Sequence, residues 1–591
     1  MGKELFPELI PEGLPDYREV LAEGKAIADA IKLGKSEFTK ERGMVVADFR
    51  LAHREAGEVY FQAQIGRASL EEQVKAQKTV YERLRENGID VGMNILTPGW
   101  LTAVPPEIRD KAPRSTSFVL EKPEDFKRIA DASPMQPLFG DYICMSPNSV
   151  NNVIGAIEAG CPGVANFSGI AWKYPYCDDD VAQVVEAVKA LGIMAGKVYE
   201  SNEVQIQGYV GDGIASAFVD HVSELGYALF EQYIAEQLCE VPYKEGLGGL
   251  MSHIPNKLAT WLAFFEALKE NARYPNRAIL HHYEGNTIEV SAEEPVYNYG
   301  LIVADFLPFA LLERKYKTGA AYLPKPIMEA VRVPNEKEIA DCIIACAAAL
   351  KKVPEFEEAG FIDEADILRR KDIILEQGKK FYRNILTKLP ELGVDIENPI
   401  HCLLAIKRLK GARFESLCHP GERDESRYRG IVPYFMTDLT KQTLDKADDK
   451  VMSLLATYKA DALMDKKIVV CSTDTHEYGL MFMDYVLKAF GADVINIDVD
   501  TDPEDALDVA SEEGALFIAV STHNGQSLAW SERAVNEIGK RNQEVKLFMG
   551  GMLNSLQEGI ADPVDVSDKI RALGVFATND IDEMFKEFAQ N

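Results

Sequence analysis

The stretch CSTDTHEYGLMF, residues 471–482, joins the end of a short β-branched run to the start of an apolar helical pattern. It places Asp474, His476 and Gly479 in the connecting loop. The run that leads into it, KIVVCS, has the length and composition of a buried strand, so the pattern predicts a strand, a loop and a helix in succession. In an open α/β sheet, such a loop lies at the carboxyl edge of the sheet, where ligands bind.

The same alternation continues towards the C-terminus. Further strands are predicted at ADVINIDV, ALFIAVS, KLFMGG and GVFAT, with helical patterns between them. Short buried strands that alternate with amphipathic helices are typical of a doubly wound parallel sheet. We therefore expect a flavodoxin-like, Rossmann-type domain over residues 461–591.

Upstream, residues 41–335 also alternate helical patterns with short apolar runs. These runs are DVGMNIL, PLFGDYICM, GVANFSG, IMAGKVY, YALFEQYI and AILHHYEG. Eight such units in 250 to 300 residues, as a rough guide, make a TIM-type (β/α)8 barrel, and six or seven can be counted here. We expect a barrel whose chemistry lies at the C-terminal ends of its strands, with an N-terminal helical arm over 1–40 and a helical extension and connector over 336–460.

Composition excludes several classes of protein. The chain has 591 residues, of which 47% are hydrophobic and 27% charged, with a formal net charge of −30. Such a charge repels nucleic acids and anionic membranes, and no apolar run long enough to span a bilayer is evident. The N-terminus lacks the features of a signal peptide, so we expect a cytoplasmic protein. The nine cysteines form no CxxC pair and are predicted to be reduced and mostly buried.

Two later loops extend the D-x-H-x-x-G pattern of Asp474, His476 and Gly479. VSTHNGQS carries Ser521 after the third predicted strand, and FMGGM carries Gly550 and Gly551 after the fourth. The set resembles the cobalamin-binding signature D-x-H-x-x-G, S-x-L, G-G of adenosylcobalamin-dependent mutases and corrinoid methyltransferases. One departure is that histidine stands at position 523 where the signature has leucine. A flavodoxin-like domain with a buried histidine is the structural alternative.

The resemblance implies a role for each of these positions. His476 would be the lower axial ligand of cobalt, and Asp474 would hold its other ring nitrogen. The glycines would leave room for the nucleotide tail of the cofactor, and Ser521 would bond to that tail. The full set that the resemblance assigns to the corrinoid comprises Asp474, His476, Gly479, Ser521, His523, Gly525, Gln526, Gly550 and Gly551.

The barrel region carries three further motifs. GIAWKYPY resembles a motif of the glutamate mutase large subunit in which two tyrosines line the active site; Tyr176 matches one of them and Trp172 replaces the other. KPIMEAVRVPNEKE resembles the segment whose lysine and glutamate contact the adenosyl ribose, which implies that role for Lys325 and Glu329. GRAS places Arg67 at a substrate-binding arginine. Taken singly, each has a plainer interpretation: a core aromatic, a helical ion pair and a surface cap.

The departures from glutamate mutase indicate a different substrate. Only one of its three substrate arginines is matched, and Asn166 replaces the glutamate that accepts a proton from the substrate ammonium group. We therefore expect a substrate without an amino group. The resemblance implies a radical carbon-skeleton isomerase of a small dicarboxylate, and the interconversion of 2-methyleneglutarate and 3-methylitaconate fits best. Arg67, Lys173, Arg109 and Arg114 are the candidate carboxylate ligands, and Tyr176, Trp172 and Asn166 the candidate catalytic residues.

Other functions stay open at this point. A corrinoid methyltransferase would share the cobalamin signature, as would a glutamate mutase-like enzyme or an aminomutase that also uses pyridoxal phosphate. A cobalamin sensor without catalysis would leave the barrel motifs unused. The cofactor expected is adenosylcobalamin, and we expect a homo-oligomer, either a dimer or a tetramer.

Overall fold

The computed structural model describes residues 9–112, 115, 117–174, 176–210, 218–248, 254–285, 295–329, 332–424, 427–523, 525–555 and 564–590. The chain divides into two compact units, Met1–Thr437 and Asp438–Asn591. Each unit has its own hydrophobic core, as expected for a chain of this length. Arg114 lies outside the described residues.

The first unit is built on a closed barrel of eight parallel strands in the order β1 to β8. The strands are β1 Phe61–Ile65, β2 Val91–Leu96, β3 Gln136–Phe139, β4 Gly163–Ala165, β5 Gln205–Val210, β6 Tyr243–Leu247, β7 Leu280–Glu284 and β8 Ala321–Leu323. The register closes between Phe61 of β1 and Tyr322 of β8. The predicted (β/α)8 barrel is confirmed.

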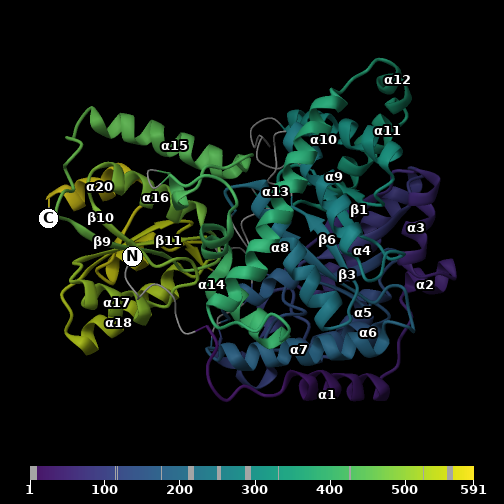
Figure 1. Cartoon of the computed structure of the whole chain (residues 1–591), viewed down its shortest axis with the longest axis horizontal. Helices are drawn as coiled ribbons and strands as arrows, with labels where there is room; N and C mark the ends of the chain where they lie inside the picture. The colour runs from purple at the N-terminus through teal and green to yellow at the C-terminus, as the bar shows by residue number, and fades with distance from the viewer. Residues whose placement is uncertain are drawn as a thin grey trace. The chain divides into compact units, whose positions relative to one another are not determined.

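Helices surround this barrel and extend beyond it. They are α1 Tyr17–Ala30, α2 Glu37–Arg42, α3 Val46–Ala56, α4 Leu70–Glu86, α5 Pro123–Ala130, α6 Ser149–Ala159, α7 Asp180–Lys197, α8 His221–Gln232, α9 Ile254–Asn271, α10 Pro295–Tyr316, α11 Glu336–Leu350, α12 Val353–Glu358, α13 Glu364–Glu391 and α14 Pro399–Cys418. Short helical turns lie at η1 Trp100–Ala103, η2 Pro106–Lys111, η3 Phe167–Ala171, η4 Tyr233–Leu238 and η5 Tyr428–Gly430. Figure 1 shows α1 alongside α7. Gly24 permits this approach, because a Cβ there would lie 2.2 Å from the carbonyl oxygen of Lys189.

The two faces of the barrel strands differ in chemistry. Tyr283 of β7 and Tyr322 of β8 lie side by side in register and contact Phe309 and Phe306 of α10, so this face points outward. Because side chains alternate along a strand, the neighbouring residues point into the barrel. The inward set is polar to an unusual degree for such a barrel and includes Gln62, Gln64, Gln207, Lys244, His282 and Glu284.

Two of the apolar runs that were expected to mark repeating strand units prove to be helical. IMAGKVY, residues 193–199, lies mostly in α7, and YALFEQYI, residues 227–234, lies in α8 and the start of η4. Both helices are buried around most of their circumference, so they lack the polar face that distinguishes an amphipathic helix from a strand.

Two expectations from composition can be compared with the structure. Val296–Tyr316 in α10 is long and apolar enough, by length and composition, to cross a membrane, in contrast to the expectation that no such run is present. An 18-residue window of this helix is 61% buried, and Phe306 and Phe309 contact Tyr322 and Tyr283 of the barrel. The nine cysteines are free thiols, and all except Cys177 are buried.

The second unit contains a five-stranded parallel sheet in the order β10-β9-β11-β12-β15, which confirms the flavodoxin-like prediction. Its strands are β9 Lys467–Ser472, β10 Asp493–Asn496, β11 Phe517–Thr522, β12 Lys546–Gly551 and β15 Phe576–Ala577, with a small hairpin of β13 Asn554–Ser555 and β14 Val564–Asp565. Its helices are α15 Asp438–Leu455, α16 Tyr478–Ala489, α17 Pro503–Glu513, α18 Ser527–Arg541, α19 Ser567–Ala572 and α20 Ile581–Gln590.

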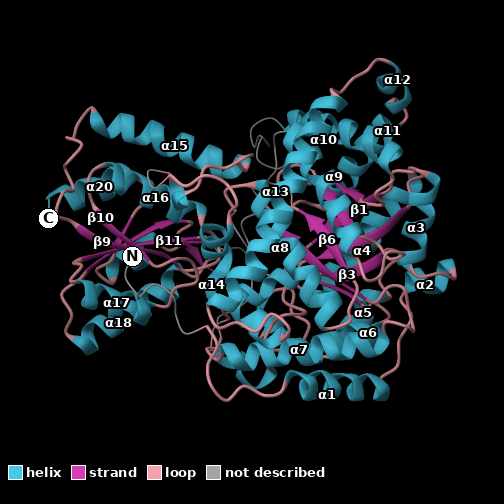
Figure 2. Ribbon diagram, in the orientation of Figure 1, coloured by secondary structure: helices cyan, strands magenta, loops and turns pink. Residues whose placement is uncertain are grey.

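Helices cover both faces of this sheet (Figure 2). Ile468 and Val470 of β9 pack with α15, α16 and α20, whereas Val469 and Cys471 pack with α17 and α18 on the opposite face. The alternation explains why the strand reads as a continuous apolar run, since both faces are buried. α15 therefore belongs to the second unit, which begins before the predicted domain boundary at 461.

Candidate functional site

The loop between β9 and α16 holds a hydrogen-bonded aspartate–histidine pair. Oδ1 of Asp474 lies 2.7 Å from Nδ1 of His476 and also accepts the His476 backbone N–H at 3.1 Å. The Asp474 side chain is buried, whereas that of His476 is 26% exposed. A carboxylate at Nδ1 fixes the proton on that nitrogen and leaves the lone pair on Nε2. Among the described residues, Nε2 makes no hydrogen bond, so it is available as a metal ligand.

The second carboxylate oxygen of Asp474 ties this loop to the next one. Oδ2 accepts the backbone N–H of His523 at 2.7 Å and the Thr473 hydroxyl at 3.2 Å. The ring of His523 lies 4.0 Å from that of His476, centroid to centroid, at an angle of 35°. Burial, and then the neighbouring His476, lower the pKa of His523. A neutral imidazole at 523 therefore supports one side of His476, in the position where the signature has leucine.

The glycines of the signature are required by close approaches within the protein. A Cβ at Gly479 would lie 2.4 Å from Oγ of Ser521, and one at Gly551 would lie 2.3 Å from the carbonyl oxygen of Thr522. Gly551 also has φ of +103°, which side chains disfavour. At Gly550 the nearest atom would be the Thr578 carbonyl oxygen at 3.0 Å. The edge thus forms a side-chain-free cradle around Ser521, which fits a corrinoid tail.

The remaining signature positions lie along the same edge. Ser521 pairs in register with Ser472 of β9 and with Gly550 of β12, so the three loops meet at the ends of adjacent strands. Gly525 has φ of +73°, and Gln526 follows it directly before α18. The structure therefore brings together all the described positions that the resemblance assigns to the corrinoid in this unit.

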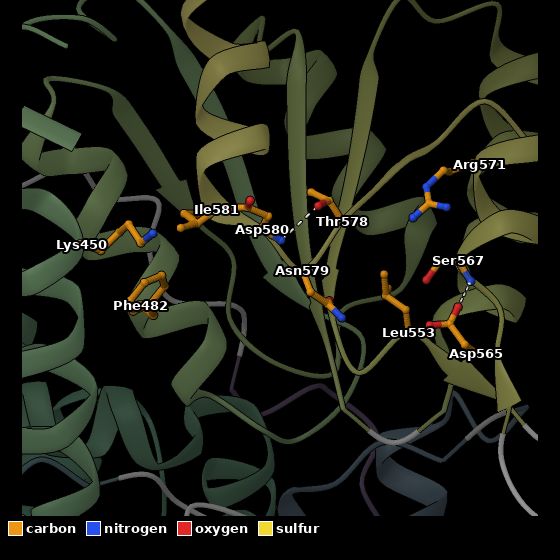
Figure 3. Close-up of a pocket in the computed structure, with 10 residues that line it drawn as sticks. All are labelled: Lys450, Phe482, Leu553, Asp565, Ser567, Arg571, Thr578, Asn579, Asp580 and Ile581. Atoms are coloured by element: carbon orange, nitrogen blue, oxygen red, sulfur yellow. Dashed lines mark hydrogen bonds between the residues drawn. The ribbon is translucent and has the colours of Figure 1, made fainter. Parts of the chain in front are cut away.

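A pocket of about 730 Å³ lies in the same unit (Figure 3). Its walls come from α15, α16, the loop after β12, the β14–α19 region and the loop after β15. The lining residues are Lys450, Phe482, Leu553, Asp565, Ser567, Arg571, Thr578, Asn579, Asp580 and Ile581. Oδ1 of Asn579 accepts the Gly551 backbone N–H at 3.0 Å, so the glycine edge and this pocket are directly linked.

In the barrel unit, polar side chains gather where the strands end. The ammonium group of Lys325, after β8, forms an ion pair with Glu284 at the end of β7 and lies 3.5 Å from Oε1 of Glu329. Its Nζ also lies 3.4 Å from Oε1 of Gln64 on β1, and the Tyr209 hydroxyl donates to Glu284 at 2.7 Å. Burial would raise the pKa of Glu284, but Lys325 outweighs this effect and the pKa is lowered. Burial raises the pKa of Glu329.

Asn166 lies at the same end of the barrel. Its Nδ2 donates to Oδ1 of Asp141 at 3.4 Å, and its Oδ1 accepts the Ser168 backbone N–H. Burial raises the pKa of Asp141 to about 6, opposed by the bond from Asn166 and the charge of Lys325. Asp141, in the loop after β3, thus places a carboxylate beside the amide of Asn166.

The other predicted substrate residues do not converge. Nε and Nη2 of Arg67 both lie 3.1 Å from Oε1 of Glu336, and Nη1 bonds to the carbonyl of Gly66. Arg109, in η2, donates to the carbonyl oxygens of Val104 and Thr102. Lys173 is exposed. The described candidates are therefore dispersed over the loops after β1, β2 and β4, and their roles stay predictions.

The aromatic candidates occupy different environments. Trp172 is buried against Tyr142 and Tyr174, with ring centroids 5.2 Å apart for the Tyr142 contact. Its carbonyl oxygen accepts a bond from the buried Nζ of Lys407 at 2.8 Å. Tyr176 is 55% exposed and has φ of +64°.

Sequence reasoning missed Asp141, Tyr209 and Glu284. The available signal was the position of each at or just after a short strand, where barrel enzymes carry their functional groups. The run AILHHYEG did end in such a glutamate, which corresponds to Glu284.

One comparison with known proteins, the match to a family model, covers this site. Residues 467–567 match the family model described as the B12 binding domain. One similar solved structure is a cobalamin-binding protein from Desulfitobacterium hafniense DCB-2, with 16% identity, a TM-score of 0.20 and coverage of 41% of this chain and 91% of that chain. Another is the methanol:cobalamin methyltransferase complex MtaBC from Methanosarcina barkeri, with 15% identity, a TM-score of 0.16 and coverage of 38% of this chain and 80% of that chain. No curated protein matches. By the match to the family model, residues 467–567 of the second unit form a B12-binding domain.

Proposed function

We propose that this protein is an adenosylcobalamin-dependent carbon-skeleton isomerase that acts on a small dicarboxylate, with 2-methyleneglutarate as the first substrate to test. The B12-binding domain accounts for the corrinoid, and the barrel in the same chain provides a chamber for the reaction. When bound, adenosylcobalamin supplies an adenosyl radical by homolysis of its cobalt–carbon bond, and this radical can abstract a substrate hydrogen atom.

One observation carries the choice of the adenosyl form. Lys325 and Glu329, which the resemblance assigns to the adenosyl ribose, lie together at the end of the barrel where such a site belongs. Oε2 of Glu329 is buried and has no hydrogen-bond partner among the described residues. An unsatisfied carboxylate oxygen is costly to keep, and a ribose hydroxyl is a donor of the kind that it lacks. A methyl corrinoid has no second ribose for such a contact.

The chain's own residues would bind, orient and shield the reactants. Asp474 holds the proton on Nδ1 of His476, so Nε2 is presented to cobalt. Tyr209 and Lys325 fix the carboxylate of Glu284. At the end of the barrel, the amide of Asn166 can donate a hydrogen bond to a substrate carboxylate.

Anaerobic assays with purified protein test the proposal. The protein is loaded with adenosylcobalamin and mixed with 2-methyleneglutarate; formation of 3-methylitaconate and a substrate-dependent organic radical signal are the expected results. Methylation of the Co(I) protein by a methyl donor, without any radical signal, would instead establish a methyltransferase.

A binding experiment isolates the ribose contact from turnover. Glu329→Gln should weaken binding of adenosylcobalamin about tenfold and leave binding of methylcobalamin unchanged. The matched control is Glu338→Gln, because Glu338 caps α11 and pairs with Arg332 outside this cluster. Equal losses for both cofactor forms would remove the argument for the adenosyl group.

A further inference from the structure

A buried lysine lies inside the barrel without a direct ion pair. Lys244, the second residue of β6, is 1% exposed. No carboxylate of the described residues lies within 4.0 Å of its Nζ, and none of their polar atoms forms a hydrogen bond with it, although Glu203 is near enough to raise its pKa. Buried charges in proteins are normally paired directly, so the Lys244 ammonium group can accept a further anionic partner.

The strand register shows that Lys244 shares the inward face with other polar residues. Lys244 pairs with Gln207 of β5, and Gly246 pairs with both Tyr209 of β5 and His282 of β7. Paired residues of neighbouring strands point to the same face, and the outward face carries Tyr283. Gln62 is inward by the same alternation, because its neighbour Phe61 pairs with the outward-facing Tyr322.

These neighbours also lack partners. The described structure provides no hydrogen-bond partner for Oε1 of Gln207, for either amide atom of Gln62 or for either ring nitrogen of His282. All three side chains are at most 2% exposed. Unpaired buried polar groups are rare in folded proteins, and three on one face of a barrel point to a ligand that satisfies them.

Two residues that pair with this inward face of the barrel have small side chains. Ala165 pairs with Gln207, and Ala321 pairs with His282. Barrel interiors are usually filled by bulky branched side chains. Alanine side chains therefore flank the polar groups on both sides, two residues below Glu284 on β7, which corresponds to about 7 Å along the strand.

The charged groups that act most strongly on Lys244 favour an anion. The charged groups that face Lys244 are Glu203 and Arg50; Glu203 accepts the Ala47 backbone N–H, and Arg50 donates to the carbonyls of Leu280, His281 and Gly319. One carboxylate thus opposes two cations. Burial lowers the pKa of His282 to about 4, so its ring is neutral.

We infer that Lys244, Gln62, Gln207 and His282 form a buried anion site that binds one carboxylate of the substrate inside the barrel. The inference rests on the proposed function for the identity of the anion as a small dicarboxylate. Lys244 supplies the charge, and the two amides and the imidazole N–H supply neutral donors.

Calorimetric titration of the cofactor-free chain with glutarate, an unreactive dicarboxylate, tests this site. Lys244→Met keeps the length of the side chain and removes the charge, and it should weaken glutarate binding at least 30-fold. Lys244→Arg should restore part of the affinity. The control is Lys75→Met, an exposed position on α4, which should bind glutarate as the unchanged protein does.

Proton uptake on glutarate binding distinguishes a direct role of Lys244 from a purely structural one, because a structural role would not change the number of protons taken up. Burial lowers the pKa of Lys244 to about 7, so at pH 8 most molecules carry a neutral amine, and a bound carboxylate raises that pKa again. Glutarate binding at pH 8 should therefore take up a proton, measured as a dependence of the heat on the buffer, and Lys244→Met should abolish this uptake.

Equal glutarate affinity in the unchanged protein and Lys244→Met would overturn the inference, as would absence of glutarate binding to the unchanged protein. Because the cofactor is not needed, binding through Lys244 without any radical chemistry would refute only the proposed function.

Discussion

Asp474→Asn tests the metal ligand with a change of one atom. The amide retains one oxygen, but its nitrogen is a donor only. If the oxygen stays with His476, the amide nitrogen faces the His523 backbone N–H across 2.7 Å, where two donors repel. If the amide turns over, the nitrogen faces Nδ1 of His476 and forces the proton onto Nε2, which then cannot bind cobalt.

Both orientations forfeit a hydrogen bond to a charged acceptor, which is worth about 1.5–3 kcal/mol. At about 1.4 kcal/mol for each factor of ten, cobalamin affinity should fall roughly 10- to 150-fold. This agrees with the range of about 10- to 100-fold for residues that orient a metal-bound histidine.

The assay combines equilibrium binding with paramagnetic resonance of the Co(II) form. In protein labelled with ¹⁵N-histidine, the unchanged chain should show cobalt hyperfine lines split into doublets by His476, and Asp474→Asn should lose that population in part. Asp498→Asn is the matched control, because among the described residues Oδ1 of Asp498 accepts a single hydrogen bond, from the Val499 backbone N–H on the neighbouring loop. Unchanged affinity and spectra in Asp474→Asn would refute the assignment of this pair.

Two further predictions concern stability. Gly551→Ala should lower the free energy of unfolding of the second unit by about 1–3 kcal/mol, the usual range for a strained backbone position, because its φ is positive and the new Cβ would clash with the Thr522 carbonyl oxygen. Gly539, in α18, has open space around it, so Gly539→Ala should instead raise that free energy by up to about 1 kcal/mol. Calorimetry measures both changes. Burial raises the pKa of Asp141 from 3.8 to about 6 despite Asn166 and Lys325, and Glu284 adds to the rise. Folding therefore loses stability as pH rises from 4 to 6, by at most about 3 kcal/mol, and Asp141→Asn should remove this loss; identical pH profiles of the barrel transition in both proteins would contradict it.

The second unit could be predicted from the sequence because its information is local. Strands such as β9 are buried on both faces and read as apolar runs, and their ends are marked by polar loops. The candidate ligand, its hydrogen-bonded carboxylate and a glycine lie within six positions of one another, from Asp474 to Gly479. A single loop therefore carries both the fold signal and the site signal.

The barrel was harder to interpret because its interior is polar. β1 reads FQAQI, β5 QIQGYV and β6 YKEGL, and none of these resembles the branched apolar strand expected in a barrel core. Conversely, α7 and α8 are apolar on nearly all sides, so their sequences resemble those of buried strands. Polar residues at the inward positions explain both why these strands are hard to recognise from the sequence and why the barrel contains a candidate substrate site.

Convergence across strands explains why the residues at the barrel end could not be found by motif. Tyr209, Glu284 and Lys325 come from β5, β7 and the loop after β8, and they meet only when the barrel closes. Of the basic residues chosen from the sequence, Arg67 was selected by resemblance and the others by charge alone, yet Arg67 pairs with Glu336 and Arg109 bonds to backbone carbonyls. Charge on a side chain indicates little until its partners are known.

The polar barrel interior is difficult to explain by folding alone. Leaving a buried polar group unpaired costs about 1–3 kcal/mol, so Gln62, Gln207 and His282 together reduce stability by an amount comparable to the net stability of many domains. Apolar side chains of similar volume would remove that cost. A chain that retains these groups beside the buried Lys244 gains from them when a ligand is present, because binding to the folded state alone returns the lost free energy. The candidate substrate site and the cost of burying these polar groups are thus two consequences of the same residues.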